Sequence, residues 1–112
     1  LGYAEKYIHK ALSVSRHYPQ AYALKGDIYL WDSLKAKPEY SKKKGLKLAI
    51  DGYEDAAKYA PDKEFQASIY LKMGNAYADL IDDRKKAKEF WQKAADASPA
   101  GSAARTAKEK MN

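Results

Sequence analysis

The sequence predicts an all-α fold in which helices stack as antiparallel pairs, and three observations lead to this prediction. A set of small and aromatic residues recurs along the chain at helical spacing. A second set, with a glycine between two aromatic residues, precedes each of the two later copies. Proline and glycine number only four and six among 112 residues, which is too few for a low-complexity linker.

The first recurring set is one large side chain between two alanines, closed by a proline. Its copies, in chain order, are Ala4, Ile8 and Ala11, then Ala49, Tyr53, Ala56 and Pro61, then Ala87, Trp91, Ala94 and Pro99. Steps of four and three residues place the first three members on one face of a helix. Alanine lets a neighbouring helix come close, the large side chain fills the remaining space, and proline ends the helix. We therefore expect the alanines and rings of the two later copies to be buried.

The second set reads aromatic, apolar, glycine, aromatic, and it comes before the alanine–aromatic set. Its two copies are Tyr22, Lys25, Gly26 and Tyr29, with lysine at the apolar position, and Tyr70, Met73, Gly74 and Tyr77. Glycine inside a helix costs about 1 kcal/mol relative to alanine. It is tolerated where another backbone packs against it, so we expect a close helix contact at Gly26 and Gly74.

In this order the two sets resemble the signature of the tetratricopeptide repeat (TPR) family. The resemblance implies an α-α superhelix, a TPR-like solenoid, of about two and a half helix-hairpin repeats plus a C-terminal capping helix. Residues 1–18 would be the second helix of a partial repeat, residues 19–61 and 62–99 two repeats, and residues 100–112 the cap. Tyrosine replaces the tryptophan of the family pattern in both first helices, and both repeats exceed the usual length of about 34 residues.

The helices expected from these patterns span residues 2–16, 19–34, 40–60, 63–80, 83–97 and 100–110. Asp62 and Asp82 stand where N-caps are expected. The last segment carries alanines along one side with lysine and glutamate around them. This composition suits a solvated helix that closes the end of a repeat array.

A lysine-rich insertion near residues 34–44 accounts for the extra length of the first complete repeat. Gly26 and Ala49 are 23 residues apart, whereas Gly74 and Ala87 are 13 apart. Pro38 could be the first residue of a lengthened second helix, or Ser41 could cap that helix. We expect residues 35–41 to be the most mobile internal segment and the insertion to be dispensable for folding. Residues 34–48, which include this insertion, hold most of the chain's net charge of +6, in Lys35, Lys37, Lys42, Lys43, Lys44 and Lys47.

The sequence offers little for catalysis. No cysteine is present, which excludes disulfides and thiolate chemistry, and neither His9 nor His17 lies at metal-ligand spacing from a second ligand. The glycines follow no phosphate-binding pattern. We therefore expect no enzymatic activity, no cofactor and no metal. No apolar run approaches the ~18 residues of a transmembrane helix, so no membrane insertion is expected. Because the chain begins at Leu1, we expect it to be part of a larger protein.

The resemblance implies a module that binds a peptide or protein segment in a concave groove lined by the first helices of the repeats. The groove residues would be Gln20, Ala23, Asp27, Leu30, Trp31, Ser68, Leu71, Lys72, Asn75, Ala78 and Asp79. Trp31 is the principal candidate, because an accessible tryptophan is typical of binding hot spots. The alternative for Trp31 is that it packs against the lysine-rich insertion or the chain end.

Two other functions remain open. The lysine-rich segment could bind nucleic acid or an acidic surface by charge, although only Tyr40 could stack on a base and no arginine could read base edges. The chain could also be purely structural and self-associating. In that case Tyr3, Tyr7 and Leu12 of the N-terminal helix would form the contact, because their face lacks its usual partner helix. The pattern identifies no particular partner and no compartment.

Overall fold

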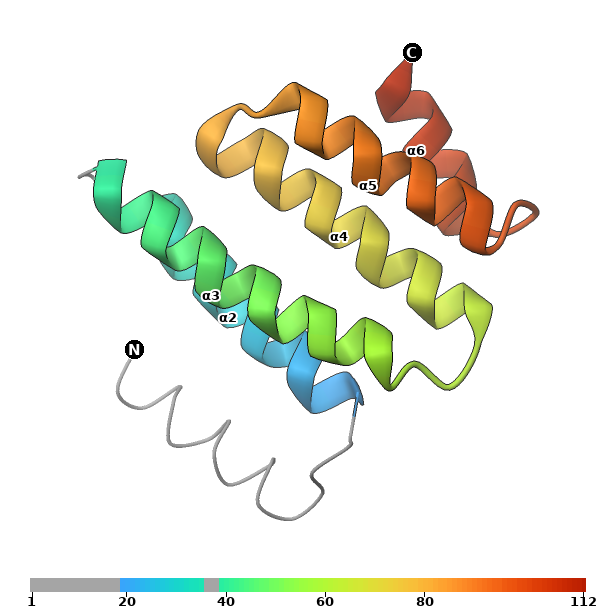
Figure 1. Cartoon of the computed structure of the whole chain (residues 1–112), viewed down its shortest axis with the longest axis horizontal. Coiled ribbons are helices and arrows are strands. Elements are labelled where there is room, and N and C mark those ends of the chain that lie inside the picture. The colour runs from blue at the N-terminus through green and yellow to red at the C-terminus, as the bar shows by residue number, and fades with distance from the viewer. Residues whose placement is uncertain (1–18, 36–38) are drawn as a thin grey trace.

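The computed structural model describes residues 19–35 and 39–112, which form five helices and no strand (Figure 1). The helices are α2 (Pro19–Lys35), α3 (Glu39–Lys58), α4 (Lys63–Ile81), α5 (Arg84–Ala97) and α6 (Ser102–Met111). Five of the expected helices are thus confirmed, with ends that differ by at most two residues. The expected helix over residues 2–16 lies outside the described residues. None of the five helices combines the length and the apolar character that crossing a bilayer requires.

The helices form two antiparallel pairs, α2 with α3 and α4 with α5, and α6 follows the second pair (Figure 1). Helix α4 is central, since it contacts all four other helices. Helices α3 and α5 both flank α4 but do not contact each other, while α2 and α6 lie behind them in this view. Helix α4 therefore lies between α3 and α5 in this view.

Each helix pair is built around one large aromatic side chain, as the repeated set predicts. The first core cluster contains Tyr53, which is 0% exposed, between Ala49 and Ala56. The second contains Trp91, which is 2% exposed, between Ala87 and Ala94. All four alanines are fully buried, so the expected burial of both sets is confirmed.

The glycines of the second set lie against these same rings. A Cβ atom placed on Gly26 would come within 2.5 Å of the Tyr53 ring, and one placed on Gly74 within 2.5 Å of the Trp91 ring. Real Cβ atoms do not approach carbon that closely, so a larger residue at either position would displace the ring. In both pairs the glycine of the first helix thus receives the ring of the second. The expected close backbone contact is present as well. A Cβ atom on Gly74 would lie 3.0 Å from the Ala87 carbonyl oxygen, and one on Gly52 of α3 would lie 2.9 Å from the Gly26 nitrogen.

The N-cap expected at Asp62 is confirmed, because its side chain accepts a hydrogen bond from the backbone N–H of Phe65 at 2.8 Å. The N-cap expected at Asp82 is wrong by one residue. Asp83 caps α5 and accepts from the backbone N–H of Lys86 at 3.0 Å, whereas Asp82 ends α4 in the left-handed conformation with φ 53°. Aspartate adopts this conformation more readily than most residues, so the two adjacent acids divide the two capping roles.

The insertion is mainly helix, as the alternative of a lengthened second helix predicted, and this argues against the expectation of a dispensable loop. Ten helical residues precede Ala49 in α3 but only three precede Ala87 in α5, so seven of the ten extra residues lengthen α3. This extension is packed. Ser33 of α2 is 5% exposed and lies against Gly45, and Leu46 belongs to the first core cluster. Ser41 lies inside the helix and does not cap it. The prediction misjudged the segment because lysines are compatible with a helix that buries only one side.

Candidate functional site

The expected groove residues lie on α2 and α4, and one ion pair joins these helices. The Lys72 ammonium lies 3.0 Å from Asp27 Oδ2. The lysine side chain is 42% exposed and the aspartate side chain 21% exposed, so the pair sits at the edge of the interior. The structure therefore brings the two rows of expected residues side by side at this point.

Several of the expected groove residues pack against the two core clusters. Ala23 and Ala78 are buried, each as a member of a core cluster, so they are not accessible to a partner and their assignment to the groove is wrong. Leu30 and Leu71 are partly buried against the two clusters, and the Ser68 hydroxyl donates to the carbonyl oxygen of Phe65 at 2.6 Å. Three of the expected residues are exposed, namely Gln20, Trp31 and Asp79.

Two further groove residues accept hydrogen bonds from the core rings. The Tyr53 hydroxyl donates to Asp27 Oδ1 at 2.6 Å, and the Trp91 indole N–H donates to Asn75 Oδ1 at 3.0 Å. Asp27 and Asn75 each directly follow the glycine that receives the ring, so the two bonds are equivalent in the two pairs. This role was not predicted from the sequence, although Asp27 and Asn75 occupy the same position in the two sets.

Burial and the Asp27 carboxylate together shape the chemistry of Tyr53. Burial raises the pKa of the Tyr53 hydroxyl, and the hydrogen bond to Asp27 and the negative charge of Asp27 raise this pKa further. Each cause favours the neutral phenol, which can donate to the carboxylate. The folded protein therefore holds this proton at a pH at which an exposed tyrosine has ionised.

Tyr53→Phe should change the pH dependence of stability in the alkaline range. Because the folded-state pKa is raised above the unfolded value of about 10, the native protein should lose about 1.4 kcal/mol of stability per pH unit above pH ~10 through this residue. Below that pH the variant should be less stable by about 1 kcal/mol, since it lacks the hydrogen bond. Urea unfolding between about pH 8 and 11 measures both effects. Parallel curves for the two proteins would contradict the assignment.

The accessible apolar surface of the candidate site is at the end of α2. Trp31 is 57% exposed and Leu34, one turn later, is 47% exposed. Among the described residues, these two are the large apolar side chains with the highest exposed fraction. The expected accessibility of Trp31 is confirmed. Leu34, which was not among the expected residues, extends its surface on the same side of the helix.

The lysine-rich segment presents its charges from the first turns of α3. Lys43, Lys44 and Lys47 are exposed and Lys42 is partly exposed. Within the described part of the chain, these four side chains make no ion pair. Lys35 is the last residue of α2, and Lys37 lies outside the described residues.

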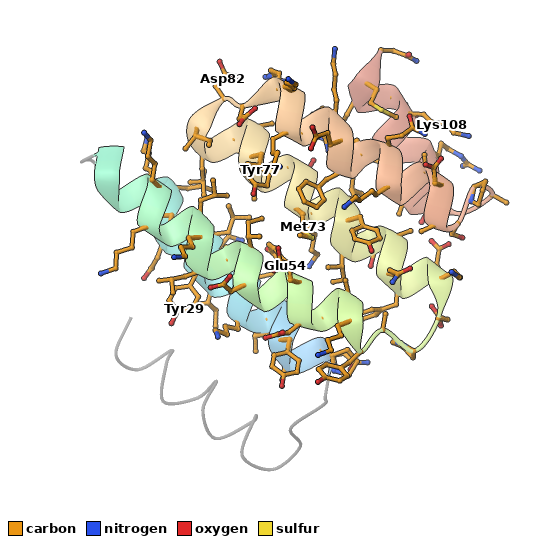
Figure 2. All side chains as sticks on the ribbon, viewed as in Figure 1. Tyr29, Glu54, Met73, Tyr77, Asp82 and Lys108 are labelled. Carbon is orange, nitrogen blue, oxygen red and sulfur yellow. The ribbon has the colours of Figure 1, made fainter. Side chains whose placement is uncertain are left out.

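A pocket between α3, α4 and α5 was not predicted from the sequence. Its lining residues are Glu54, Ala57, Lys58, Gln66, Tyr70, Met73, Phe90 and Lys93. In Figure 2, Glu54 of α3 and Met73 of α4 lie near each other in the strip between α3 and α5. The residue in the sequence that could have indicated this pocket is Phe90. It is a second aromatic residue next to Trp91 but lies off the face that carries the repeated packing set.

Neither the residues nor comparisons with known proteins point to a cofactor or a named family. Within residues 19–35 and 39–112, no group of three or more His, Cys, Asp or Glu side chains is placed to hold a metal ion. A scan against protein-family models, a search of curated proteins and a search of solved structures each found no match to this chain. The resemblance to TPR proteins therefore stays a prediction from the sequence pattern.

Proposed function

We propose that this chain is a TPR-like repeat module that binds a segment of another protein and catalyses no reaction. The observation that carries the proposal is the exposure of Trp31, at 57% of its surface, beside Leu34. The order of the helix contacts supports the repeat part of the proposal. Helix α2 contacts α4 and α4 contacts α6, whereas α3 and α5 do not meet, so the first helices of successive units form a continuous row.

The proposed site is smaller than the groove expected from the sequence. Trp31 and Leu34 provide its apolar centre. The Asp27–Lys72 ion pair lies about one turn before Trp31 and presents both charges near the surface. Tryptophan is enriched at binding hot spots because its large ring buries much area with few torsions to immobilise. A partner segment with an apolar anchor and polar flanking groups matches this surface.

Trp31→Ala should weaken peptide binding without destabilising the fold. The experiment selects peptides from a random displayed library on the native protein and then measures their affinity for purified variants. Loss of an exposed hot-spot tryptophan should cost about 2 kcal/mol of binding, which is roughly a thirty-fold rise in Kd. The melting temperature should stay nearly constant, because the ring is mostly in water. Gln92→Ala on the exposed side of α5 is the matched control. Peptides that bind native protein and Trp31→Ala equally would contradict the site.

The lysines at the start of α3 provide a second candidate function, binding of nucleic acid or an acidic surface by charge. The supporting observation is that Lys43, Lys44 and Lys47 are exposed on successive turns with no ion pair among the described residues. Binding of this kind would weaken steeply with added salt. A single-stranded oligonucleotide in the same assay separates the two functions, since substituting these three lysines by glutamine would abolish its binding and leave Trp31-dependent peptides unaffected.

A further inference from the structure

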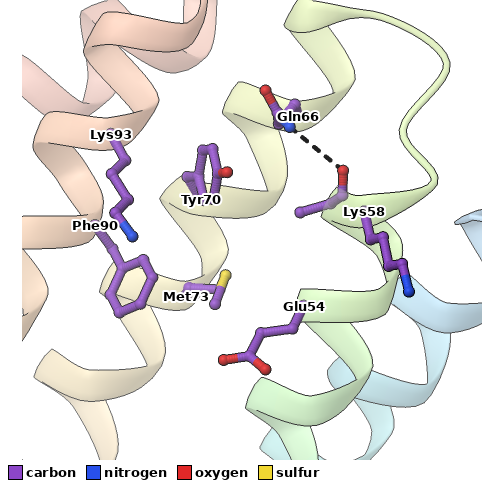
Figure 3. A pocket seen from close by; sticks show the side chains of 8 residues that line it. Glu54, Lys58, Gln66, Tyr70, Met73, Phe90 and Lys93 are labelled. Atoms are coloured by element: carbon purple, nitrogen blue, oxygen red, sulfur yellow. Dashed lines mark hydrogen bonds between the residues drawn. The ribbon is translucent and has the colours of Figure 1, made fainter.

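The pocket between α3 and α5 has a volume of about 310 Å³, and α4 together with Phe90 of α5 forms its floor (Figure 3). This volume is at the lower end of the range for ligand sites, which suits one large side chain. Its lining residues come from α3, α4 and α5, whereas Trp31 and Leu34 belong to α2. It is therefore a separate surface from the site proposed above.

The floor of the pocket is apolar and held in place by packing. Met73 is 1% exposed, and Tyr70 and Phe90 are partly buried against the cores. The ring of Phe90 stacks on that of Tyr77, with centroids 5.5 Å apart and planes 6° apart. A floor formed by a thioether and two aromatic rings favours an apolar or aromatic side chain over a polar one.

The two lysines that line the pocket, Lys93 and Lys58, point in different directions. The Lys93 ammonium lies 4.9 Å from the centroid of the Phe90 ring and 5.9 Å from that of the Tyr70 ring, so it is held above the floor. In contrast, the Lys58 ammonium points away from the pocket in Figure 3 and lies 5.3 Å from the Tyr59 ring. Lys93 has no ion-pair partner within the described part of the chain. It thus offers a positioned cation that no carboxylate of these residues neutralises.

The opposite end of the pocket carries the carboxylate of Glu54, which also has no ion pair among the described residues (Figure 3). A ligand with many negative charges, such as a nucleic acid, would be repelled there. A ligand that carries its negative charge at one end, beside an apolar group, would meet Lys93 there and keep that charge away from Glu54. Charge complementarity therefore restricts the ligand to one kind of chemistry.

We propose that this pocket binds a second protein segment, one that places an apolar side chain on Tyr70, Met73 and Phe90 and an adjacent carboxylate beside Lys93. Burial of the apolar side chain contributes binding free energy, and the carboxylate determines which segments bind. The ion pair forms beside aromatic rings, where the exposed Lys93 ammonium already lies 4.9 Å from the centroid of the Phe90 ring. This function goes beyond the proposed Trp31 site and does not depend on it.

Three blocked tripeptides test the proposal: acetyl-Phe-Asp-Asp-amide, acetyl-Phe-Lys-Lys-amide and acetyl-Ala-Asp-Asp-amide. The readout is the methyl NMR signal of Met73. The chain has one other methionine, Met111 of α6, whose signal serves as an internal control and is distinguished from Met73 by a Met73→Leu variant. The Phe-Asp-Asp peptide should shift the Met73 signal with a Kd of about 1 mM, as expected for a small ligand, while Met111 stays unchanged. The other two peptides should bind at least about five-fold more weakly.

Variants of α5 separate the proposed recognition from general charge effects. Lys93→Glu should abolish the preference for the Phe-Asp-Asp peptide, and Lys93→Arg should retain it. Lys88→Glu, which changes an exposed lysine of the same helix outside the pocket, should bind like the native protein. Trp31→Ala should also bind like the native protein, so failure of one site is distinguishable from failure of the other. No Met73 shift up to about 10 mM peptide, ten times the expected Kd, would overturn the proposal. Equal effects of Lys93→Glu and Lys88→Glu would overturn it as well.

Discussion

Gly52→Leu should destabilise the protein by about 3 kcal/mol or more, because it separates two helices whose backbones touch. A Cβ atom on Gly52 would lie 2.9 Å from both the Gly26 nitrogen and the Tyr22 carbonyl oxygen, and 3.3 Å from Gly26 Cα. All three are backbone atoms, so no side-chain rotation relieves the clash. Helix α3 can move away from α2 only by opening the core around Tyr53, and urea unfolding measures the cost as a lower midpoint.

Two companion variants make the Gly52 result specific. Gly52→Ala adds only the clashing atom and should cost about 1–3 kcal/mol from overpacking, offset in part by the ~1 kcal/mol that alanine gains in helix propensity. Asp51→Ala changes the neighbouring exposed residue and should stay within about 0.5 kcal/mol of the native protein. If Gly52→Leu unfolds at the same urea concentration as Asp51→Ala, α2 and α3 do not pack at this glycine.

Gly52 also shows which positions cannot be predicted by comparing the two copies of the repeated set. The shared positions could be predicted, because Ala49, Tyr53 and Ala56 recur 38 residues later with the same spacing and the same burial. Gly52 could not, because the residue 38 positions after it is Phe90. One copy uses this position for close approach of two backbones, and the other uses it for the ring that lines the pocket. A comparison restricted to common residues overlooks both.

The surroundings of the residues assigned to the groove were harder to predict than the helices, for a physical reason. Helical periodicity gives the direction in which a side chain leaves the helix, but it does not show which groups that side chain will meet. Asp27 and Asn75 were assigned to an open groove because they are among the positions left over once the packing residues of their helices are assigned. In the structure each accepts a hydrogen bond from a buried ring of the paired helix. Only the exposure of Trp31 is confirmed, at 57%, and it could be predicted because Trp31 lies two residues beyond the packing Tyr29 on the same helix.

Trp91→Ala should cost about 3–5 kcal/mol of folding stability, the usual range for removing a buried tryptophan. The ring is 2% exposed and fills the space above Gly74, so alanine leaves a cavity at the centre of the second core cluster. It also removes the indole N–H that donates to Asn75 Oδ1 at 3.0 Å. Urea unfolding gives the loss in stability directly, and Trp91→Phe separates its two parts, because it keeps a ring but removes the donor.

The same variants provide a test of the contrast between the two tryptophans. The chain contains only two, so Trp91→Ala leaves Trp31 as the sole indole, and Trp31→Ala leaves Trp91. Acrylamide should quench the fluorescence of Trp31 readily and that of Trp91 weakly, in keeping with exposures of 57% and 2%. The loss in stability should follow the opposite order, large for Trp91→Ala and small for Trp31→Ala. A shielded Trp31 whose removal costs as much as that of Trp91 would make it a core residue, and the α2 surface would then lose the side chain on which its proposed binding depends.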